Sequence, residues 1–471
     1  MPDAPERRFR GTLTDRDVKR HIPHAFDVPD CTTRMKVQLG FDPAVVAGHR
    51  NMICMTLFDP VGFRGAGHRH GNRHAVEIGR DTATPGFLPG PLPPGRWVAQ
   101  LDTHMVMPGV SCRYEVTVTF ECDESLAVAP CAPPAATPRF DAVINHRAGW
   151  YRGDLHAHTV HSDGTWEVPD LVAAARTRGL DFVTLTDHNT TGGLAAMAGH
   201  SGDGLLTMGG QELTTFWGHA LCLGGHAWRD WRVTREGPEM AALANRLSAA
   251  GELYVIAHPR TEGDPHCTGC RWMYPAMMPG AARLVEVWNG DWFGRGARDR
   301  DRNEEALRLW YRWLNQGHRL VATAGSDVHG PGRQYESGST GFCVVYADQL
   351  SETGVLRGVG AGHLYLSRGP RLSFAVRRGV RRRGMMGDRV AVLDASGVVS
   401  LAVSWDGALD AARLQLIAGG RPRDTLPISA AGVHEWVLDP TVPAARWYTV
   451  EMRAHDGSML ALTNPIFFAA V

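Results

Sequence analysis

Residues 168–188 read VPDLVAAARTRGLDFVTLTDH, and they decide the fold class. The first half carries apolar residues at positions 168, 171, 172 and 175, which is helical spacing, and Gly179 suits the end of that helix. The mostly apolar run 180–186 suits a buried parallel strand. Because Asp187 and His188 follow directly, this strand ends at side chains that can bind a metal ion.

Similar units recur between residues 146 and 368. Apolar runs that suit strands lie at 253–257, 283–288 and 320–324, and helical patterns lie at 240–250 and 303–316. Strands that alternate with helices imply a parallel sheet, here closed into a barrel. The predicted fold class is therefore α/β, with a distorted parallel β/α barrel over residues 146–368.

Strand-and-turn patterns flank this barrel on both sides. Residues 33–39 and 113–120 alternate with period two, and so we predict an N-terminal antiparallel β-sandwich domain over residues 1–126. The stretch 127–145, whose first part is rich in Ala and Pro, is the predicted linker. Strand patterns at 398–404 and 447–452 predict a C-terminal antiparallel β domain over residues 369–471. We expect both β domains to pack on the barrel and shape its pocket, with Arg368 reaching the rim.

The composition is that of a globular protein with two or three domains: 471 residues, 44% hydrophobic and 21% charged. A formal net charge of zero favours neither nucleic acid nor an anionic membrane as a partner. No apolar run is long enough to cross a bilayer, and residues 1–20 lack a signal-peptide pattern. The odd number of cysteines, nine, predicts reduced thiols and a cytoplasmic location, with Cys267 and Cys270 as free thiols.

Five polar motifs follow one another through the barrel region. Residues 153–164 read GDLHAHTVHSDG, and on a strand His156 and His158 face the same side and can hold one ion. The other four motifs contain His188, Glu212 with His219, His258, and Asp327 with His329. Any one motif alone is more often structural, but all five in order at strand ends predict a single catalytic site.

Four other polar stretches leave alternatives open. We interpret His68-Arg-His70 as an exposed turn, because no apolar strand precedes it, and His161 as a surface histidine. Asp154 either orients a ligating histidine or caps a turn. Asn289 either lines the pocket or makes a turn.

In their order and spacing, the motifs resemble the PHP superfamily, named for polymerase and histidinol phosphatase, over about residues 151–330. The flanking β domains, with EVWNG at 286–290 and TNPIFF at 463–468, are similar to the subgroup that includes carbaryl hydrolase and microcin-processing proteins. The resemblance implies a distorted β/α barrel with up to three divalent metal ions. It assigns to the first ion His156, His158, Glu212 and Asp327; to the second Glu212, His219 and His258; and to the third Asp163, His188 and His329.

Six imidazoles and three carboxylates form a mixed ligand set that suits Zn, Mn or Fe, and so we predict two or three such divalent ions as cofactors. The predicted catalytic residues are Glu212, Asp163 and Arg260, the last as an anchor for a substrate oxyanion. Because the total charge of three divalent ions exceeds that of the three carboxylates, the expected partner is a small anionic substrate.

The predicted function is hydrolysis of phosphomonoesters or phosphodiesters, with a metal-bridging hydroxide as the nucleophile. One alternative, implied by the carbaryl-hydrolase resemblance, is hydrolysis of a carbamate, carboxylic ester or amide. Another is a non-catalytic binding protein whose barrel is supported by metal ions.

Overall fold

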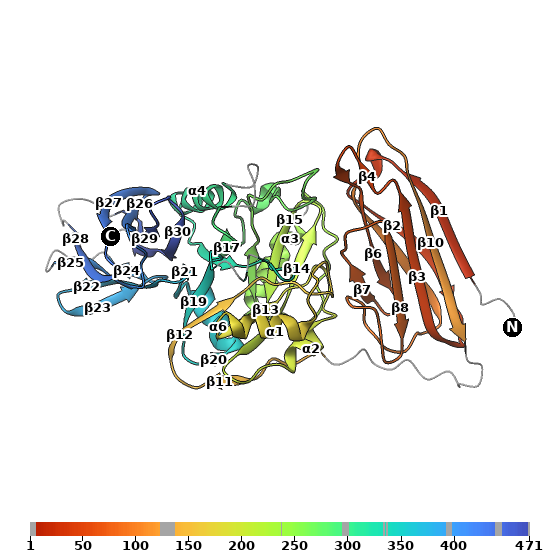
Figure 1. The fold of residues 1–471 in the computed structure, drawn as a ribbon, viewed down its shortest axis with the longest axis horizontal. Coiled ribbons are helices and arrows are strands. Elements are labelled where there is room, and N and C mark those ends of the chain that lie inside the picture. Colours follow the sequence, from red (N-terminus) through yellow and green to blue (C-terminus); the bar gives the residue numbers. More distant parts are fainter. Residues whose placement is uncertain are drawn as a thin grey trace.

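The computed structural model describes residues 6–122, 137–236, 238–293, 301–332, 335, 338–391, 398–438 and 445–469. Its N-terminal, central and C-terminal parts lie in a row (Figure 1). Residues 127–136 of the predicted linker lie outside the described residues. No helix in the described ranges is both long and apolar enough to span a membrane.

Residues 6–122, called the N-terminal region below, form two four-stranded antiparallel sheets. One sheet has the order β1 (Glu6–Leu13), β10 (Cys112–Cys122), β3 (Thr32–Asp42) and β8 (Arg73–Gly79). The other has the order β2 (Arg20–Val28), β9 (Gly95–Met105), β6 (Met52–Phe58) and β7 (Phe63–Gly67). Alternate residues of both sheets share one core, so the period-two patterns at 33–39 and 113–120 are strands, as predicted.

One long sheet runs through the central and C-terminal parts. Its central portion has the order β18 (Val321–Gly325), β17 (Leu284–Asn289), β16 (Leu253–Ile256), β15 (Gly218–Leu223), β14 (Leu206–Thr215), β13 (Phe182–Leu185), β12 (Gly149–Asp154) and β19 (Phe342–Ala347). The predicted strands at 180–186, 253–257, 283–288 and 320–324 correspond to β13, β16, β17 and β18. A bridge between Ala157 and Val328, just beyond β12 and β18, brings these two strand ends together.

The central sheet is mixed, and the prediction of a parallel sheet is wrong at β15 and β19. The pairs β12–β13, β13–β14, β16–β17 and β17–β18 are parallel, but β15 is antiparallel to both of its neighbours and β19 is antiparallel to β12. Only Phe216 and Trp217 connect β14 to β15. Such a short link permits a hairpin but not the crossover that a parallel pair requires.

Five described helices accompany the central strands: α1 (Val168–Thr177), α2 (Leu194–Ala198), α3 (Glu239–Ala249), α4 (Arg302–Asn315) and α6 (Glu352–Ala361). The helical patterns at 168–178, 240–250 and 303–316 thus predicted α1, α3 and α4. Each buries an apolar stripe, which in α4 includes Leu307, Trp310 and Leu314. The largest hydrophobic core joins α3 and α4 to the central strands.

Residues 369–469, called the C-terminal region, continue the central sheet. Beyond β19 the sheet passes through β21 (Leu364–Ser367), β30 (Met459–Thr463), β29 (Trp447–Arg453), β26 (Arg413–Ala418) and β27 (Arg421–Pro427). A separate antiparallel sheet has the order β23 (Arg381–Met385), β22 (Arg371–Arg378), β25 (Val399–Asp406) and β28 (Ala431–Leu438). The hydrophobic core of this region also takes in Val344 of β19 and Tyr365 of β21.

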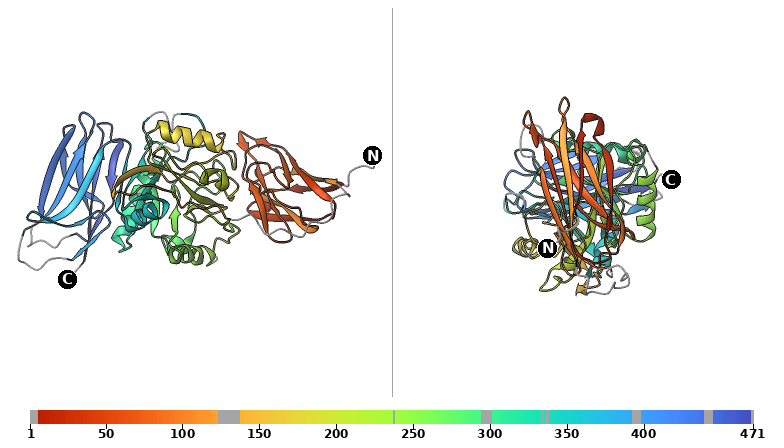
Figure 2. Two further views of the ribbon diagram at one scale, coloured as in Figure 1. Left: turned by 90° about the horizontal axis from the view of Figure 1, so that it is seen from below. Right: turned by 90° about the vertical axis from the view of Figure 1, so that its right-hand side faces the viewer.

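The N-terminal region is attached differently. Among the described strands, none of its strands pairs with a strand of the central sheet, and Figure 2 shows its two sheets at the end of the molecule opposite the C-terminal strands. Side chains make the contacts instead. Lys19 Nζ lies 2.7 Å from Asp264 Oδ2 and 4.1 Å from the ring centroid of Trp217, and Phe63 stacks on Trp228 at 4.3 Å.

Four cysteines form disulfides, so the prediction of reduced thiols is wrong for them. Cys31 is bonded to Cys122, and Cys267 to Cys270. Cys31 precedes β3 and Cys122 ends β10, and because these strands are antiparallel neighbours the two cysteines meet at one sheet edge. Free and buried are Cys54, Cys112, Cys222 and Cys343.

Candidate metal centre

Nine predicted ligands converge at one end of the central sheet. Most follow a strand directly: β12 precedes His156 and His158, β13 precedes His188, β16 precedes His258, and β18 precedes Asp327 and His329. The exceptions are Glu212 within β14 and His219 within β15, which face each other across the hairpin. Asp163 comes from the loop after β12. The order of strands thus brings together side chains that are up to 173 positions apart in the sequence.

Glu212 lies at the middle of the cluster and is fully buried. Its Oε2 atom lies 3.2 Å from His156 Nε2, 3.3 Å from His158 Nε2 and 2.8 Å from His188 Nδ1. Its Oε1 atom lies 3.0 Å from His219 Nδ1. Oε1 is also 3.1 Å from the Nε2 atom of His258. One carboxylate therefore faces five imidazoles, which is the arrangement expected of a bridging ligand.

Asp327 completes one group of potential ligands. Its Oδ1 atom lies 3.0 Å from His158 Nε2 and 3.4 Å from His156 Nε2, and both nitrogens also face Glu212. These are the four residues that the PHP resemblance assigned to the first metal ion. Ligand atoms of three of them, His156, His158 and Glu212, all lie within 4.8 Å of one another.

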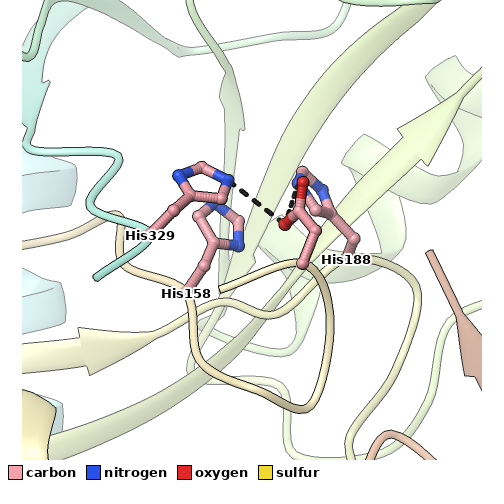
Figure 3. A group of neighbouring side chains, drawn as sticks. His158, His188 and His329 are labelled. Atoms are coloured by element: carbon pink, nitrogen blue, oxygen red, sulfur yellow. Dashed lines mark ion pairs between the residues drawn. The ribbon is translucent and has the colours of Figure 1, made fainter. Parts of the chain in front are cut away.

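A second group surrounds Asp163 at the mouth of the cluster. Its Oδ1 atom lies 3.2 Å from His329 Nε2 and 3.4 Å from His188 Nε2. Figure 3 shows His158, His188 and His329 gathered around one carboxylate, and ligand atoms of these histidines and Asp163 all lie within 4.8 Å of one another. The third predicted ligand group is therefore assembled, with His158 beside it.

Hydrogen bonds within the protein do not satisfy these atoms. His156 Nε2, Glu212 Oε2, Asp163 Oδ1 and both ring nitrogens of His158 are buried without a hydrogen-bond partner in the described structure. By contrast, His219 Nδ1 and His258 Nε2 are hydrogen-bonded to Glu212 Oε1, at 3.0 and 3.1 Å. Since buried polar groups are normally paired, a shared cation would supply the missing partner. The nine residues therefore fit the divalent ions that the motifs predict.

The protonation states also suit metal binding. Burial lowers the pKa of His158 to about 3 and that of His219 to about 4, so both rings are neutral and have a free lone pair. Burial opposes ionisation of Glu212, but the neighbouring rings of His188 and His156 outweigh it and hold the pKa of this carboxyl well below its usual range. His158 and His219 thus present neutral imidazoles beside an ionised carboxylate. At His156, His188 and His258 the neighbouring carboxylates outweigh burial and raise the pKa, so these rings would release a proton on binding an ion.

Glu286 of β17 was not predicted from the sequence. Its Oε1 atom accepts a hydrogen bond from His156 Nδ1 at 3.1 Å, and its Oε2 atom accepts one from the backbone N–H of His258 at 2.9 Å. The first contact fixes the ring of His156 so that Nε2 faces the cluster. The only signal was a carboxylate inside an otherwise apolar strand, which is costly unless it has partners.

Asp154 and Asn289 also position ligands. Asp154 accepts hydrogen bonds from the backbone N–H of Ser326 and from the Tyr335 hydroxyl, each at 2.9 Å. These contacts tie the end of β12 to the loop that carries Asp327. Asn289 donates through Nδ2 to Asp327 Oδ2 at 3.3 Å. Asp154 therefore lies beside the ligands, whereas Asn289 contacts the ligand Asp327 but is not among the described residues that line the pocket.

Backbone strain accumulates at the ligands. The φ angles of His258 and Asp327 are 24° and 54°, and that of Asn189, next to His188, is 56°. Residues other than glycine rarely adopt this left-handed conformation, and where they do it is often at functional sites. The side chain of Asn189 stabilises its own turn, since its Oδ1 accepts from the backbone N–H of Thr214 at 2.8 Å and its Nδ2 donates to the carbonyl of Thr214, also at 2.8 Å.

A cavity of about 580 Å³ opens over the cluster, between the central and N-terminal parts. Six of the nine predicted ligands line it: Asp163, His188, His219, His258, Asp327 and His329. The N-terminal region contributes His49, Arg50, Asn51, Met52, His68 and His70. A larger hollow of about 880 Å³ lies on the sheet of β1, β10, β3 and β8, but none of the nine ligands lines it. The smaller cavity is therefore the candidate substrate site.

The interpretation of His68-Arg-His70 as an exposed turn is wrong for His68, whereas His70 is exposed as predicted. His68 is buried, and its ring centroid lies 4.6 Å from that of His188, while His70 Nε2 lies 3.6 Å from Asp163 Oδ2. His161 is not a surface histidine either, because it is half-buried and its Nδ1 accepts from the backbone N–H of Gly86 at 3.0 Å. Local patterns miss the burial of His68 and His161 because it arises where the N-terminal region packs against the central part.

Neither arginine that the sequence suggested for the pocket lines this cavity. Arg260 is half-buried next to the ligand His258 but is absent from the described lining residues, so its catalytic role stays a prediction. Arg368 donates to Ser458 Oγ at 3.4 Å, within the C-terminal region. The expectation that Arg368 reaches the rim of the site is therefore wrong.

Three solved structures are similar to this chain. One is a two-domain protein from Bacteroides vulgatus that contains a predicted PHP-like metal-dependent phosphoesterase, with 16% identity, a TM-score of 0.39, and coverage of 70% of this chain and 100% of that one. An amidohydrolase from Chromobacterium violaceum, with bound sulfate and no metal, has 18% identity, a TM-score of 0.27, and coverage of 39% and 89%.

The third is a candidate metal-dependent phosphoesterase from Bifidobacterium adolescentis, with 19% identity, a TM-score of 0.28, and coverage of 44% of this chain and 94% of that one. No family model and no curated protein matched the sequence. All three TM-scores are below 0.5, so these similarities do not establish the function.

Proposed function

We propose that this chain is a metal-dependent hydrolase of the PHP superfamily that acts on phosphate esters. The observation that carries the proposal is the convergence of buried, unpartnered ligand atoms on Glu212. A purely structural cluster of this kind would leave several buried polar atoms without partners, at about 1–3 kcal/mol each. A site that holds cations removes this cost and provides a reason for the cluster.

Each proposed ligand group contains at least one carboxylate. His156, His158 and Asp327 would hold one ion together with Glu212, and His219 and His258 would hold a second at the other oxygen of Glu212. A third would lie between Asp163, His188 and His329. When bound, such divalent ions lower the pKa of water and stabilise negative charge on the attacked centre and the leaving oxygen.

The chain itself contributes orientation. Glu286 keeps the Nε2 atom of His156 toward the cluster, and Asn289 holds Asp327. His329 donates through Nδ1 to the backbone carbonyl of Asp327 at 2.8 Å, which turns its Nε2 atom toward Asp163. Because these partners fix the ligands before substrate arrives, little reorganisation is needed during the reaction.

The cavity favours an anionic substrate. Its described acidic lining residues are Asp163 and Asp327, both proposed ligands whose charge the cations would offset. Arg50 and His70 line the opposite wall, from the N-terminal region. A phosphate group placed on the cations would therefore meet a positive or neutral wall, while the N-terminal region limits access of bulk water.

A panel of chromogenic esters tests the proposal: a phosphomonoester, a phosphodiester, an acetate and a carbamate, each with Zn²⁺, Mn²⁺ or Fe²⁺. We expect turnover of a phosphate ester, and its loss in Glu212→Gln, while the control Glu121→Gln at the exposed end of β10 keeps full activity. Turnover of the acetate or carbamate alone would favour the carbaryl-hydrolase alternative. No turnover of any ester by metal-loaded protein would favour a binding protein.

A further inference from the structure

The sheet face of the N-terminal region that meets the central part is polar, although it is buried. In β6 and β9, every second residue points into the hydrophobic core between the two sheets. The alternate residues, which lie on the opposite face of the sheet, face the central part: Cys54, Thr56, Gln100, Asp102 and His104. All five are at most 4% exposed, because Phe216 and Trp231 of the central part cover this face.

Most of these polar groups have partners. Asp102 accepts hydrogen bonds from Thr56 Oγ1 at 2.6 Å and from Gln100 Nε2 at 2.7 Å. His104 is the exception: it is 0% exposed, and neither of its ring nitrogens has a hydrogen-bond partner in the described structure. An unpartnered buried polar group lowers the stability of the folded protein, so we expect His104 to have an additional partner.

Two further potential ligands lie beside His104. Cys54 Sγ is 3.9 Å from His68 Nδ1, and ligand atoms of Cys54, His68 and His104 all lie within 4.8 Å of one another. The pairing of β6 with β9 skips His104, because the register shifts between Met52 and Ile53. Such a bulge re-aims a side chain, here within reach of Cys54 and His68.

We propose that Cys54, His68 and His104 bind a thiophilic transition-metal ion, Zn²⁺, at a site separate from the cluster around Glu212. A thiolate with two imidazoles is a ligand set that selects zinc over the harder metals that carboxylates favour. Zn–S and Zn–N bonds of about 2.3 and 2.1 Å can span the observed separation of Cys54 and His68. Binding breaks the S–H bond of Cys54, forms an S–Zn bond and releases the proton to solvent.

The position of the proposed zinc site indicates what the bound ion would do. The ring of His68 lies 4.6 Å from that of His188, which belongs to the proposed catalytic cluster. An ion held by β6, β9 and the loop after β7 would fix His68 against the cluster. The bound ion would thus hold in place the cavity wall that the N-terminal region provides.

Zinc K-edge absorption spectroscopy and elemental analysis of the full-length, zinc-loaded protein test the proposal. We expect a sulfur scatterer at about 2.3 Å. In Cys54→Ala the sulfur signal and about one zinc per chain should disappear. The matched control is Cys112→Ala, since Cys112 is also buried in the N-terminal region but belongs to none of the candidate ligand groups. Replacing both Cys267 and Cys270 by Ser excludes a contribution from that pair and should leave the signal unchanged.

The proposal is overturned if the wild-type protein shows no sulfur scatterer, or if the signal survives in Cys54→Ala. Should Cys54→Ala not fold, His104→Gln, which keeps the thiol, must still lose about one zinc per chain if the proposal holds. The nine ligands around Glu212 include no sulfur. Glu212→Gln should therefore lose ester hydrolysis and keep the sulfur signal, so the two proposals fail separately.

Discussion

The N-terminal and C-terminal regions have similar sequence patterns but are joined to the central part in opposite ways. The C-terminal strands extend the central sheet from β19 through β21 to β30, and the two parts share a hydrophobic core. The N-terminal strands share no ladder with the central sheet among the described residues, and contact it through polar and aromatic side chains over the cluster. One region therefore completes the fold, and the other completes the cavity.

Asn464 illustrates the first kind of attachment. Its side chain accepts from the backbone N–H of Ala322 at 2.8 Å and donates to the carbonyls of Ala322 and Leu364 at 3.0 and 3.1 Å. His70 illustrates the second, since its half-exposed ring lines the cavity near Asp163. Substitutions in the two regions should therefore separate stability from substrate binding.

Truncation should give the largest difference. A chain that ends at Gly369 loses β29 and β30, and so exposes the edge of β21 and apolar side chains of the central core such as Tyr311, which stacks on Trp447 in the full chain. We expect it to be insoluble. A chain that starts at residue 137 should instead fold and bind metal, with impaired discrimination among esters. Sedimentation measures the solubility of the two truncated chains, and elemental analysis measures their metal content. If the two chains were equally soluble and held equal amounts of metal, the two regions would not differ in how they are attached to the central part.

Asn464→Ala should destabilise the protein by about 3 kcal/mol, because three buried backbone groups lose a partner at about 1–3 kcal/mol for each unsatisfied group. Denaturant unfolding measures the change, with Asn145→Ala at an exposed position as the control. The kcat of the folded fraction should stay unchanged. A stability loss below about 1 kcal/mol would mean that this residue does not tie the C-terminal region to the central part.

Acid should weaken the N-terminal attachment. Burial lowers the pKa of His104 to about 3, from an ordinary value near 6.5, so the unfolded chain takes up this proton first. The neutral ring's contribution to stability is complete above pH 6.5 and falls by up to about 1.4 kcal/mol per unit as the pH drops toward 3. Unfolding of chelator-treated protein between pH 7 and 5 should therefore depend less on pH in His104→Gln than in the wild type. Equal slopes would refute this.

His70→Ala should have the smallest effect on the fold. We expect KM for a phosphate ester to rise about tenfold, which corresponds to about 1.4 kcal/mol of binding, with stability within about 0.5 kcal/mol of the wild type. Steady-state kinetics beside His146→Ala, an exposed histidine that does not line the cavity, provide the comparison. A fall in kcat at constant KM would instead place His70 in the chemical step.

Local sequence patterns predicted the structural elements that depend on residues close together in the sequence. The helical spacing at 168–175 and the apolar run at 180–186 correspond to α1 and β13, and the ligand motifs lie at or near the ends of the strands. The antiparallel course of β15 was missed because neither β14 nor β15 was among the predicted strands, so the two-residue link between them was not recognised as a hairpin. The roles of Glu286, His68 and His70 depend on residues more than 100 positions away or on contact between regions, which periodicity does not report.

Metal content per chain tests the proposed catalytic centre most directly. Purified wild-type protein, reconstituted and freed of excess metal, should hold at least two transition-metal ions per chain at the nine predicted ligands, beyond any ion that depends on Cys54. Glu212→Gln should lose most of these ions while circular dichroism stays that of a folded protein, because apolar strands rather than Glu212 build the core. Less than one ion per chain after reconstitution, or a full complement in Glu212→Gln, would contradict the metal-dependent hydrolase.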